Sequence, residues 1–121
     1  FDSPTRVVRA AMEAAYEESG IEAAVAQFHE MKASHSPDGF DESLLNGLGY
    51  RLLRADRIED AIVLFELNVA EYPDASNPYD SLGEAYLAAG DTVRAIANYE
   101  RSVELDPENT NGLAVLERIR G

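Results

Sequence analysis

Hydrophobic residues along this chain recur with the spacing of an α-helix. One helical stripe, at positions i, i+3, i+4, i+7 and i+8, is formed by Tyr79, Leu82, Gly83, Tyr86 and Leu87. A matching stripe farther along consists of Ala95, Ile96, Tyr99 and Val103. The alternating β-branched residues that indicate strands do not occur in the sequence. The pattern therefore predicts an all-α protein.

Capping and turn residues divide the chain into seven expected helices. Ser3 followed by Pro4 is typical of a helix start, and Gly20 of a helix stop. The richest turn signal is Ser36-Pro37-Asp38-Gly39, which predicts a loop. The expected helices run from Pro4 to about Ser19, from Ile21 to about Ser34, from a cap at Asp41 or Ser43 to about Ala55, from Arg57 to Glu71, from Asn77-Pro78 to Gly90, from a cap at Asp91 to Leu105, and from Asn109 or Thr110 to about Arg120.

Two of the expected helix pairs repeat each other at an interval of 34 residues. The matching pairs are Leu48-Gly49 with Leu82-Gly83, Ala61-Ile62 with Ala95-Ile96, Phe65 with Tyr99, Val69 with Val103, and Pro73 with Pro107. Such a period is typical of stacked helical hairpins. Glycine lets a neighbouring helix approach the backbone, and we expect Phe65 and Tyr99 to fill the space between one hairpin and the next.

The second of these pairs resembles the tetratricopeptide repeat at nearly every signature position. The residues that carry the resemblance are the stretch from Tyr79 to Tyr86 together with Gly90, Ala95, Tyr99 and Pro107. The preceding pair departs at Leu45 and Leu52, where aromatic residues are usual, and at Asp56, where the next repeat has glycine. Aspartate tolerates the left-handed turn better than most residues, so we expect this hairpin to form.

The resemblance implies a right-handed superhelical stack of about three antiparallel hairpins, closed by a C-terminal capping helix. Within a single domain of residues 1–121, it predicts a degenerate first hairpin at 3–37, repeats at 41–73 and 75–107, and the capping helix at 109–120. In the first hairpin, Met12 and Ala15 stand where glycine and tyrosine are expected.

In this family the first helix of each hairpin lines a concave groove that takes an extended peptide or a neighbouring helix. The resemblance thus implies a non-catalytic interaction module without a cofactor. The candidate groove residues, matched phase by phase, are Arg9, Glu13, Tyr16, Asn46, Tyr50, Leu53, Arg54, Asp80, Glu84, Leu87 and Arg118. Chaperone-binding members hold a terminal carboxylate with basic residues, but Asn46 and Asp80 stand in those places here. Tyr16 and Tyr50 can equally well pack on a neighbouring helix.

A narrower resemblance links residues 44–53 and 65–86 to short arrays that follow the catalytic domain of bacterial serine hydrolases, of the penicillin-binding/β-lactamase-like and esterase kinds. The chain begins at Phe1 without methionine, which agrees with an excised or processed piece. The alternative to a free-standing interaction module is therefore an accessory domain that stabilises an upstream hydrolase or helps it to dimerise.

The formal net charge of -13 argues against nucleic acid as a partner and against anionic lipid, because their phosphates would be repelled. The acidity either serves solubility or provides a groove for basic partners. Nine arginines against the single Lys32 indicate a bacterial source. The absence of cysteine fits either the cytoplasm or the periplasm, and the sequence leaves the partner, the compartment and homo-oligomerisation open.

Motifs of enzymes and metal sites are incomplete in this sequence. Ser81-Leu82-Gly83-Glu84 lacks the flanking glycines of a nucleophile elbow, and Gly47-Leu48-Gly49 has no preceding strand to make a dinucleotide loop. His29 has alanine four residues later, and His29 with His35 lacks a third metal ligand. We therefore predict neither catalysis nor metal binding.

Overall fold

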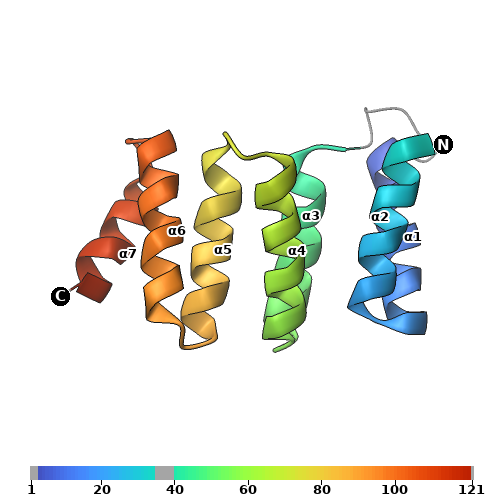
Figure 1. Ribbon diagram of the computed structural model, residues 1–121, viewed down its shortest axis with the longest axis horizontal. Helices are drawn as coiled ribbons and strands as arrows, with labels where there is room; N and C mark the ends of the chain where they lie inside the picture. Colours follow the sequence, from blue (N-terminus) through green and yellow to red (C-terminus); the bar gives the residue numbers. More distant parts are fainter. Residues whose placement is uncertain (1–2, 35–39, 121) are drawn as a thin grey trace. The chain divides into compact units, whose positions relative to one another are not determined.

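The computed structural model of the chain describes residues 3–34 and 40–120. Over these residues the protein consists of seven α-helices, labelled in Figure 1, without a strand. Backbone contacts divide the chain into an N-terminal unit, Phe1–Leu44, and a C-terminal unit, Leu45–Gly121. The single domain expected from the sequence stays a prediction. The expected loop at residues 36–39, and His35, lie outside the described residues.

The N-terminal unit is built around the hairpin of α1 (Pro4–Ser19) and α2 (Ile21–Ser34). The Ser3 hydroxyl oxygen caps α1 by accepting the Arg6 backbone N–H at 3.2 Å. Gly20 ends the helix with a φ of 90°, a conformation that glycine adopts without strain. The hairpin buries one face of each helix, through Val8, Met12, Ala24, Phe28 and Met31.

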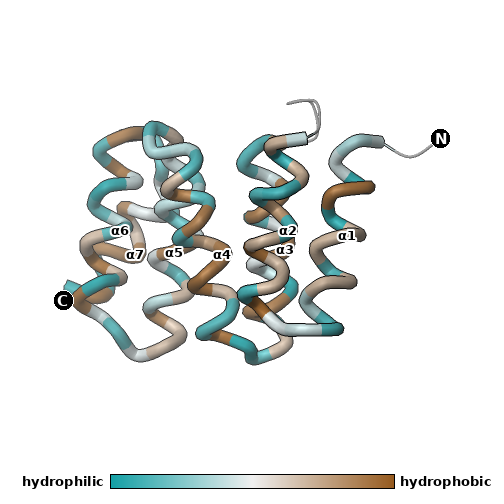
Figure 2. The backbone as a smooth tube through the Cα atoms, turned by 45° about the vertical axis from the view of Figure 1, so that its right-hand side comes forward, coloured by the Kyte–Doolittle hydropathy of each residue, from teal (hydrophilic) through white to brown (hydrophobic). Residues whose placement is uncertain are grey.

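Most of α3 (Glu42–Arg54) and the four remaining helices belong to the C-terminal unit. These are α4 (Ile58–Glu71), α5 (Ser76–Ala88), α6 (Thr92–Leu105) and α7 (Thr110–Arg120). Figure 1 shows α4, α5 and α6 side by side in chain order, with α7 next to α6. In Figure 2 apolar and polar segments alternate along these helices, as amphipathic packing requires.

The helix ends follow local capping chemistry. Asp91 accepts the Arg94 backbone N–H at 3.0 Å, and Asn109 accepts that of Gly112 at 3.1 Å. At the start of α3, the Asp41 carboxylate accepts the Ser43 backbone N–H at 2.9 Å, so Asp41 is the cap. Two helices begin one residue away from the expected position: α4 begins at Ile58 instead of Arg57, and α5 begins at Ser76 instead of Asn77.

The turns inside the two repeating hairpins adopt the same left-handed backbone conformation. Asp56 has a φ of 63°, and Gly90, which lies 34 residues later, has a φ of 82°. Asp56 is the only residue other than glycine with a positive φ in the described part of the chain. The expectation that aspartate would support this turn is therefore confirmed.

A glycine-on-aromatic contact closes each repeating hairpin. A Cβ added to Gly49 would lie 2.3 Å from Cε1 of Phe65, and one added to Gly83 would lie 2.8 Å from Cδ2 of Tyr99. Each ring thus lies against the backbone of its own partner helix. From the sequence we expected these rings to fill the space between one hairpin and the next. Phe65 does this as well, because it also packs with Leu82 of the next hairpin.

Candidate functional site

Eight of the candidate residues lie on α3 and α5, the first helices of the two repeating hairpins, and on α7, the last helix of the C-terminal unit. We name the surface that they occupy the α3/α5/α7 face. Its candidate residues are Asn46, Tyr50, Leu53, Arg54, Asp80, Glu84, Leu87 and Arg118. Side-chain hydrogen bonds join α3 to α5 and α5 to α7 across this face.

Tyr50 connects the core of the unit to the face. Its ring meets the buried Phe65 ring edge-on, with centroids 5.2 Å apart. Its hydroxyl donates to the Glu84 carboxylate at 3.3 Å. Burial is the main cause that raises the pKa of the Tyr50 phenol, and the negative charges of Glu84 and Asp80 raise it further, while Ser81 acts in the opposite direction. Tyr50 therefore both packs and presents a polar group.

Asp80 is held in place by amide side chains from the start of α7. Asn109 Nδ2 donates to its carboxylate at 2.8 Å, and Asn111 Nδ2 donates at 3.2 Å. Asn109 also donates to the buried Ser102 hydroxyl, so the network reaches α6. These hydrogen bonds restrict the position of the Asp80 carboxylate.

Sequence reasoning missed Asn109 and Asn111 as members of this network, although Asn109 was recognised as a possible helix start. It also missed Ser81, whose hydroxyl donates to the Asn46 side-chain oxygen. The 34-residue repeat offers a partial signal, because Asn46 and Asp80 occupy the same phase on α3 and α5. No local sequence pattern predicts hydrogen bonds between residues that are about 30 positions apart in the chain.

Tyr99 on α6 packs beneath the face, against α5. The side chain is 1% exposed, and its ring lies on Gly83 of α5. Burial raises the pKa of its phenol, and the charges of Asp80 and Glu84 raise it further.

The remaining candidate residues of the face are of two kinds, leucines that pack and arginines that are exposed. Leu53 is half-buried against the cluster around Phe65, and Leu87 against the cluster around Tyr99, so both act chiefly in packing. Arg54 and Arg118 are exposed, and neither forms an ion pair within residues 3–34 and 40–120.

The three other candidates lie on α1 of the N-terminal unit and are considered apart from this face. Arg9 Nε lies 3.9 Å from the Glu13 carboxylate, one turn farther along the helix. Tyr16 is half-buried. The prediction that these three residues share a groove with the C-terminal unit stays a prediction.

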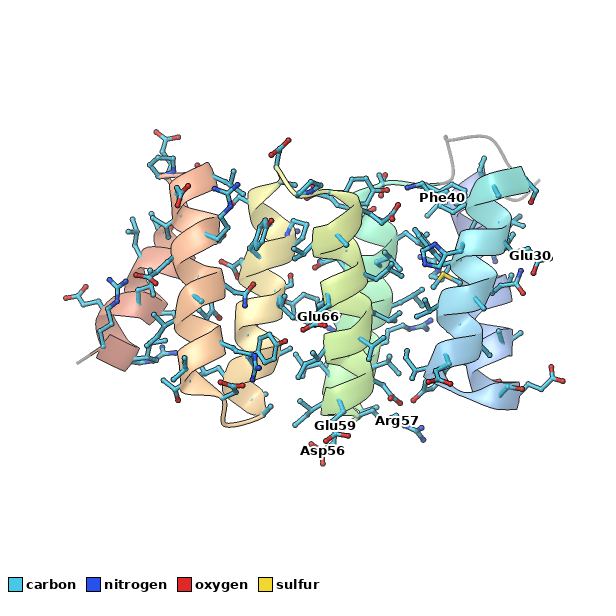
Figure 3. All side chains as sticks on the ribbon, viewed as in Figure 1. Glu30, Phe40, Asp56, Arg57, Glu59 and Glu66 are labelled. Carbon is cyan, nitrogen blue, oxygen red and sulfur yellow. The ribbon has the colours of Figure 1, made fainter. Side chains whose placement is uncertain are left out.

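The second-helix side of the C-terminal unit carries a different polar group. The Tyr86 hydroxyl donates to Glu66 of α4, labelled in Figure 3, and the Arg94 guanidinium lies 5.9 Å from the Tyr86 ring centroid. These side chains border a shallow cleft of about 420 Å³. Within the described residues, no group of three His, Cys, Asp or Glu side chains could hold a metal ion.

Residues 77–109 match the family model described as the tetratricopeptide repeat. Over these residues the chain is similar to that family. The match covers almost all of α5 and α6, including Gly83 and Tyr99, whose contact closes the repeat hairpin.

A curated relative is the Hsp70-Hsp90 organizing protein of Triticum aestivum. It is 42% identical to this chain over 53 residues, which is 44% of the chain. The match takes in 9% of the wheat protein, so this chain spans less than a tenth of that relative's length.

A similar solved structure is the first tetratricopeptide domain of Spaghetti (RPAP3), bound to the HSP90 peptide SRMEEVD. The TM-score is 0.67 at 22% identity, over 98% of this chain and 93% of that one. The likeness confirms the fold predicted from the sequence, an all-α stack of tetratricopeptide hairpins. Among the described helices, none has both the length and the apolar character needed to cross a membrane.

Proposed function

We propose that this chain is a non-catalytic protein-interaction module and that its α3/α5/α7 face binds an extended peptide segment of a partner protein. The observation that carries the proposal is the gathering of polar groups there: the Tyr50 hydroxyl donates to the Glu84 carboxylate, and the Asp80 carboxylate accepts from the Asn109 and Asn111 amides. A surface that combines aromatic and hydrogen-bonding groups suits the backbone and side chains of a peptide.

The similar proteins support binding of a peptide but leave its chemistry open. The RPAP3 domain is bound to a peptide of HSP90, and at 22% identity the likeness carries the fold alone. On this chain, Asn46 and Asp80 occupy positions where a clamp for a terminal carboxylate would need basic groups.

A selection of random linear peptides displayed on phage tests the proposal. The strongest peptide is titrated into isotope-labelled protein, and amide chemical shifts are recorded. We expect the largest changes on α3, α5 and α7, and weaker binding for Tyr50→Phe, which keeps the ring on Phe65 but loses the hydroxyl. Changes confined to α4 and α6, or no binding peptide at all, would refute the proposal.

A second proposal is that the chain is an accessory domain of a bacterial serine hydrolase, which it stabilises or helps to dimerise. Residues 44–53 and 65–86 carry this proposal through their resemblance to such arrays. An immunoblot of source cells measures the mass of the native gene product. A band near 13.3 kDa would exclude this second proposal, whereas a band several times larger, with hydrolase activity lost on deletion of this region, would support it.

A further inference from the structure

Helix α7 is poorly suited to form a helix by itself. It has 11 residues and is the shortest of the described helices, and isolated helices shorter than about 12–15 residues are marginal in water. Its first turn begins with Thr110, Asn111 and Gly112, which all have low helix propensity. The helical structure of α7 therefore depends on its contacts with the rest of the C-terminal unit.

The apolar contacts of α7 are confined to one side of the helix. Gly112 is buried, and a Cβ added there would lie 3.0 Å from Cγ2 of Val103, so this glycine allows α7 to approach α6 closely. Val115 and Leu116, which are 7% and 5% exposed, join the cluster around Tyr99. The opposite side of α7 is exposed. Docking of α7 thus buries few side chains, and separation of α7 from α6 would leave most of the core of the unit intact.

Hydrogen bonds to one carboxylate of α5 fix the start of α7. Asn109 Nδ2 donates to the Asp80 carboxylate at 2.8 Å, and Asn111 Nδ2 lies 3.2 Å from each of the two carboxylate oxygens. We name Asp80, Asn109 and Asn111 the amide latch. At the other end of α7, Arg120 forms an ion pair with Glu100, but both side chains are exposed, so this pair contributes little. The latch is therefore the main polar attachment of α7.

We propose that α7 is a releasable cap: it undocks and unfolds while the helices before it stay folded, and the amide latch sets how often this happens. Asn111 and Arg118 belong to the α3/α5/α7 face through α7, so the face is complete only while α7 is docked. A peptide that contacts both α5 and α7 binds the docked form and shifts the equilibrium toward it. This last step rests on the proposed peptide-binding function, whereas the release of α7 does not.

Amide hydrogen exchange of the full chain at low urea concentrations tests the release of α7 without any ligand. We expect the amides of Val115 and Leu116 to exchange through a local opening with a shallow dependence on urea, because little surface is exposed in it. The amides of α5 should exchange through a larger unfolding with a steep dependence on urea. Equal free energies of opening and equal urea dependence for α5 and α7 would overturn the proposal.

Variants with a matched control test the latch. Asn111→Asp replaces the amide donor by a carboxylate facing Asp80, and it should speed the exchange of the α7 amides about tenfold. Adding Asp80→Asn returns a donor to the pair and should restore most of the protection. Asn98→Asp is the same change on α6, where the amide donates to the Arg94 carbonyl of its own helix, and it should leave the exchange of α7 unchanged. If Asn111→Asp has no more effect than this control, or Asp80→Asn restores nothing, the latch is wrong.

The peptide obtained from the phage selection tests the link between α7 and binding. We expect it to slow the exchange of the α7 amides and to bind Asn111→Asp severalfold more weakly than the parent. A peptide that shifts the amides of α3 and α5 but leaves the exchange of α7 unchanged would overturn this link and leave peptide binding standing. If no peptide binds, the proposed function fails, while the release of α7 is decided by the exchange of the free protein alone.

Discussion

Two glycines on α3 provide the sharpest test of the packing. Gly47 and Gly49 are separated by one residue on the same helix, and both can be replaced by alanine. A Cβ at position 47 would have no atom within 4 Å, apart from its immediate neighbours and its own helix backbone. A Cβ at position 49 would lie 2.3 Å from Cε1 of Phe65 and 2.7 Å from Cδ1. The same chemical change should therefore have opposite effects on stability.

The magnitudes follow from helix propensity and overpacking. Alanine is favoured over glycine inside a helix by about 1 kcal/mol, so Gly47→Ala should stabilise the protein by about that amount. Overpacking costs about 1–3 kcal/mol, and the upper end applies at position 49 because the Phe65 ring is 0% exposed and has little room to move. After the gain in propensity, Gly49→Ala should destabilise the protein by about 2 kcal/mol.

Urea denaturation followed by far-ultraviolet circular dichroism measures both free energies of unfolding, and amide hydrogen exchange on α3 and α4 shows which part of the chain responds. We expect the two variants to differ by about 3 kcal/mol. If Gly49→Ala is as stable as the parent, the phenyl ring does not lie on that glycine. If Gly47→Ala is destabilised, position 47 is covered and not exposed.

Three further predictions concern the core, the turn and the phenols. Tyr99→Ala should lower the free energy of unfolding by about 3–5 kcal/mol, and an unchanged thermal midpoint would disprove its burial. Asp56→Gly should stabilise the protein by about 0.5 kcal/mol in urea, since φ is 63° there, whereas a loss of stability would show that the aspartate side chain matters more than backbone strain. Folding raises the pKa of the phenols of Tyr50, Tyr86 and Tyr99, that of Tyr86 to about 12, chiefly because burial disfavours the phenolate. The stabilisation of the folded state by these shifts is fully present below the unfolded pKa of about 10 and is lost as pH rises through the folded pKa values. The urea midpoint should therefore fall in alkali, and it should fall less for Tyr86→Phe. A midpoint that does not change with pH would contradict the shifts.

The sequence by itself predicted the helices, their caps and the hairpin repeat. These features depend on interactions within one or two helical turns. The Ser3 hydroxyl reaches the Arg6 N–H, the Asp91 carboxylate reaches the Arg94 N–H, and Asp56 turns the chain where Gly90 does 34 residues later. Such local chemistry is visible in the order of residues, because the partners are at most four positions apart.

Much of the candidate site was also visible, since the 34-residue period assigns Tyr50 and Glu84 to equivalent positions on successive first helices. The period could not show which packing contacts and hydrogen bonds these residues make. Tyr50 both packs on Phe65 and donates to Glu84, and Asp80 is held by amides from α7. Leu53 and Leu87, nominated for a groove, lie chiefly against the core.

The tertiary structure alone decided the role of Tyr99. In the sequence this residue is an aromatic position of the repeat, and its whole side chain is accounted for by packing. Only when α6 lies against the bare backbone of Gly83 is the ring enclosed, and this burial raises the pKa of the Tyr99 phenol. The fit of one ring depends on the separation and rotation of two packed helices, and a one-dimensional pattern does not contain these quantities.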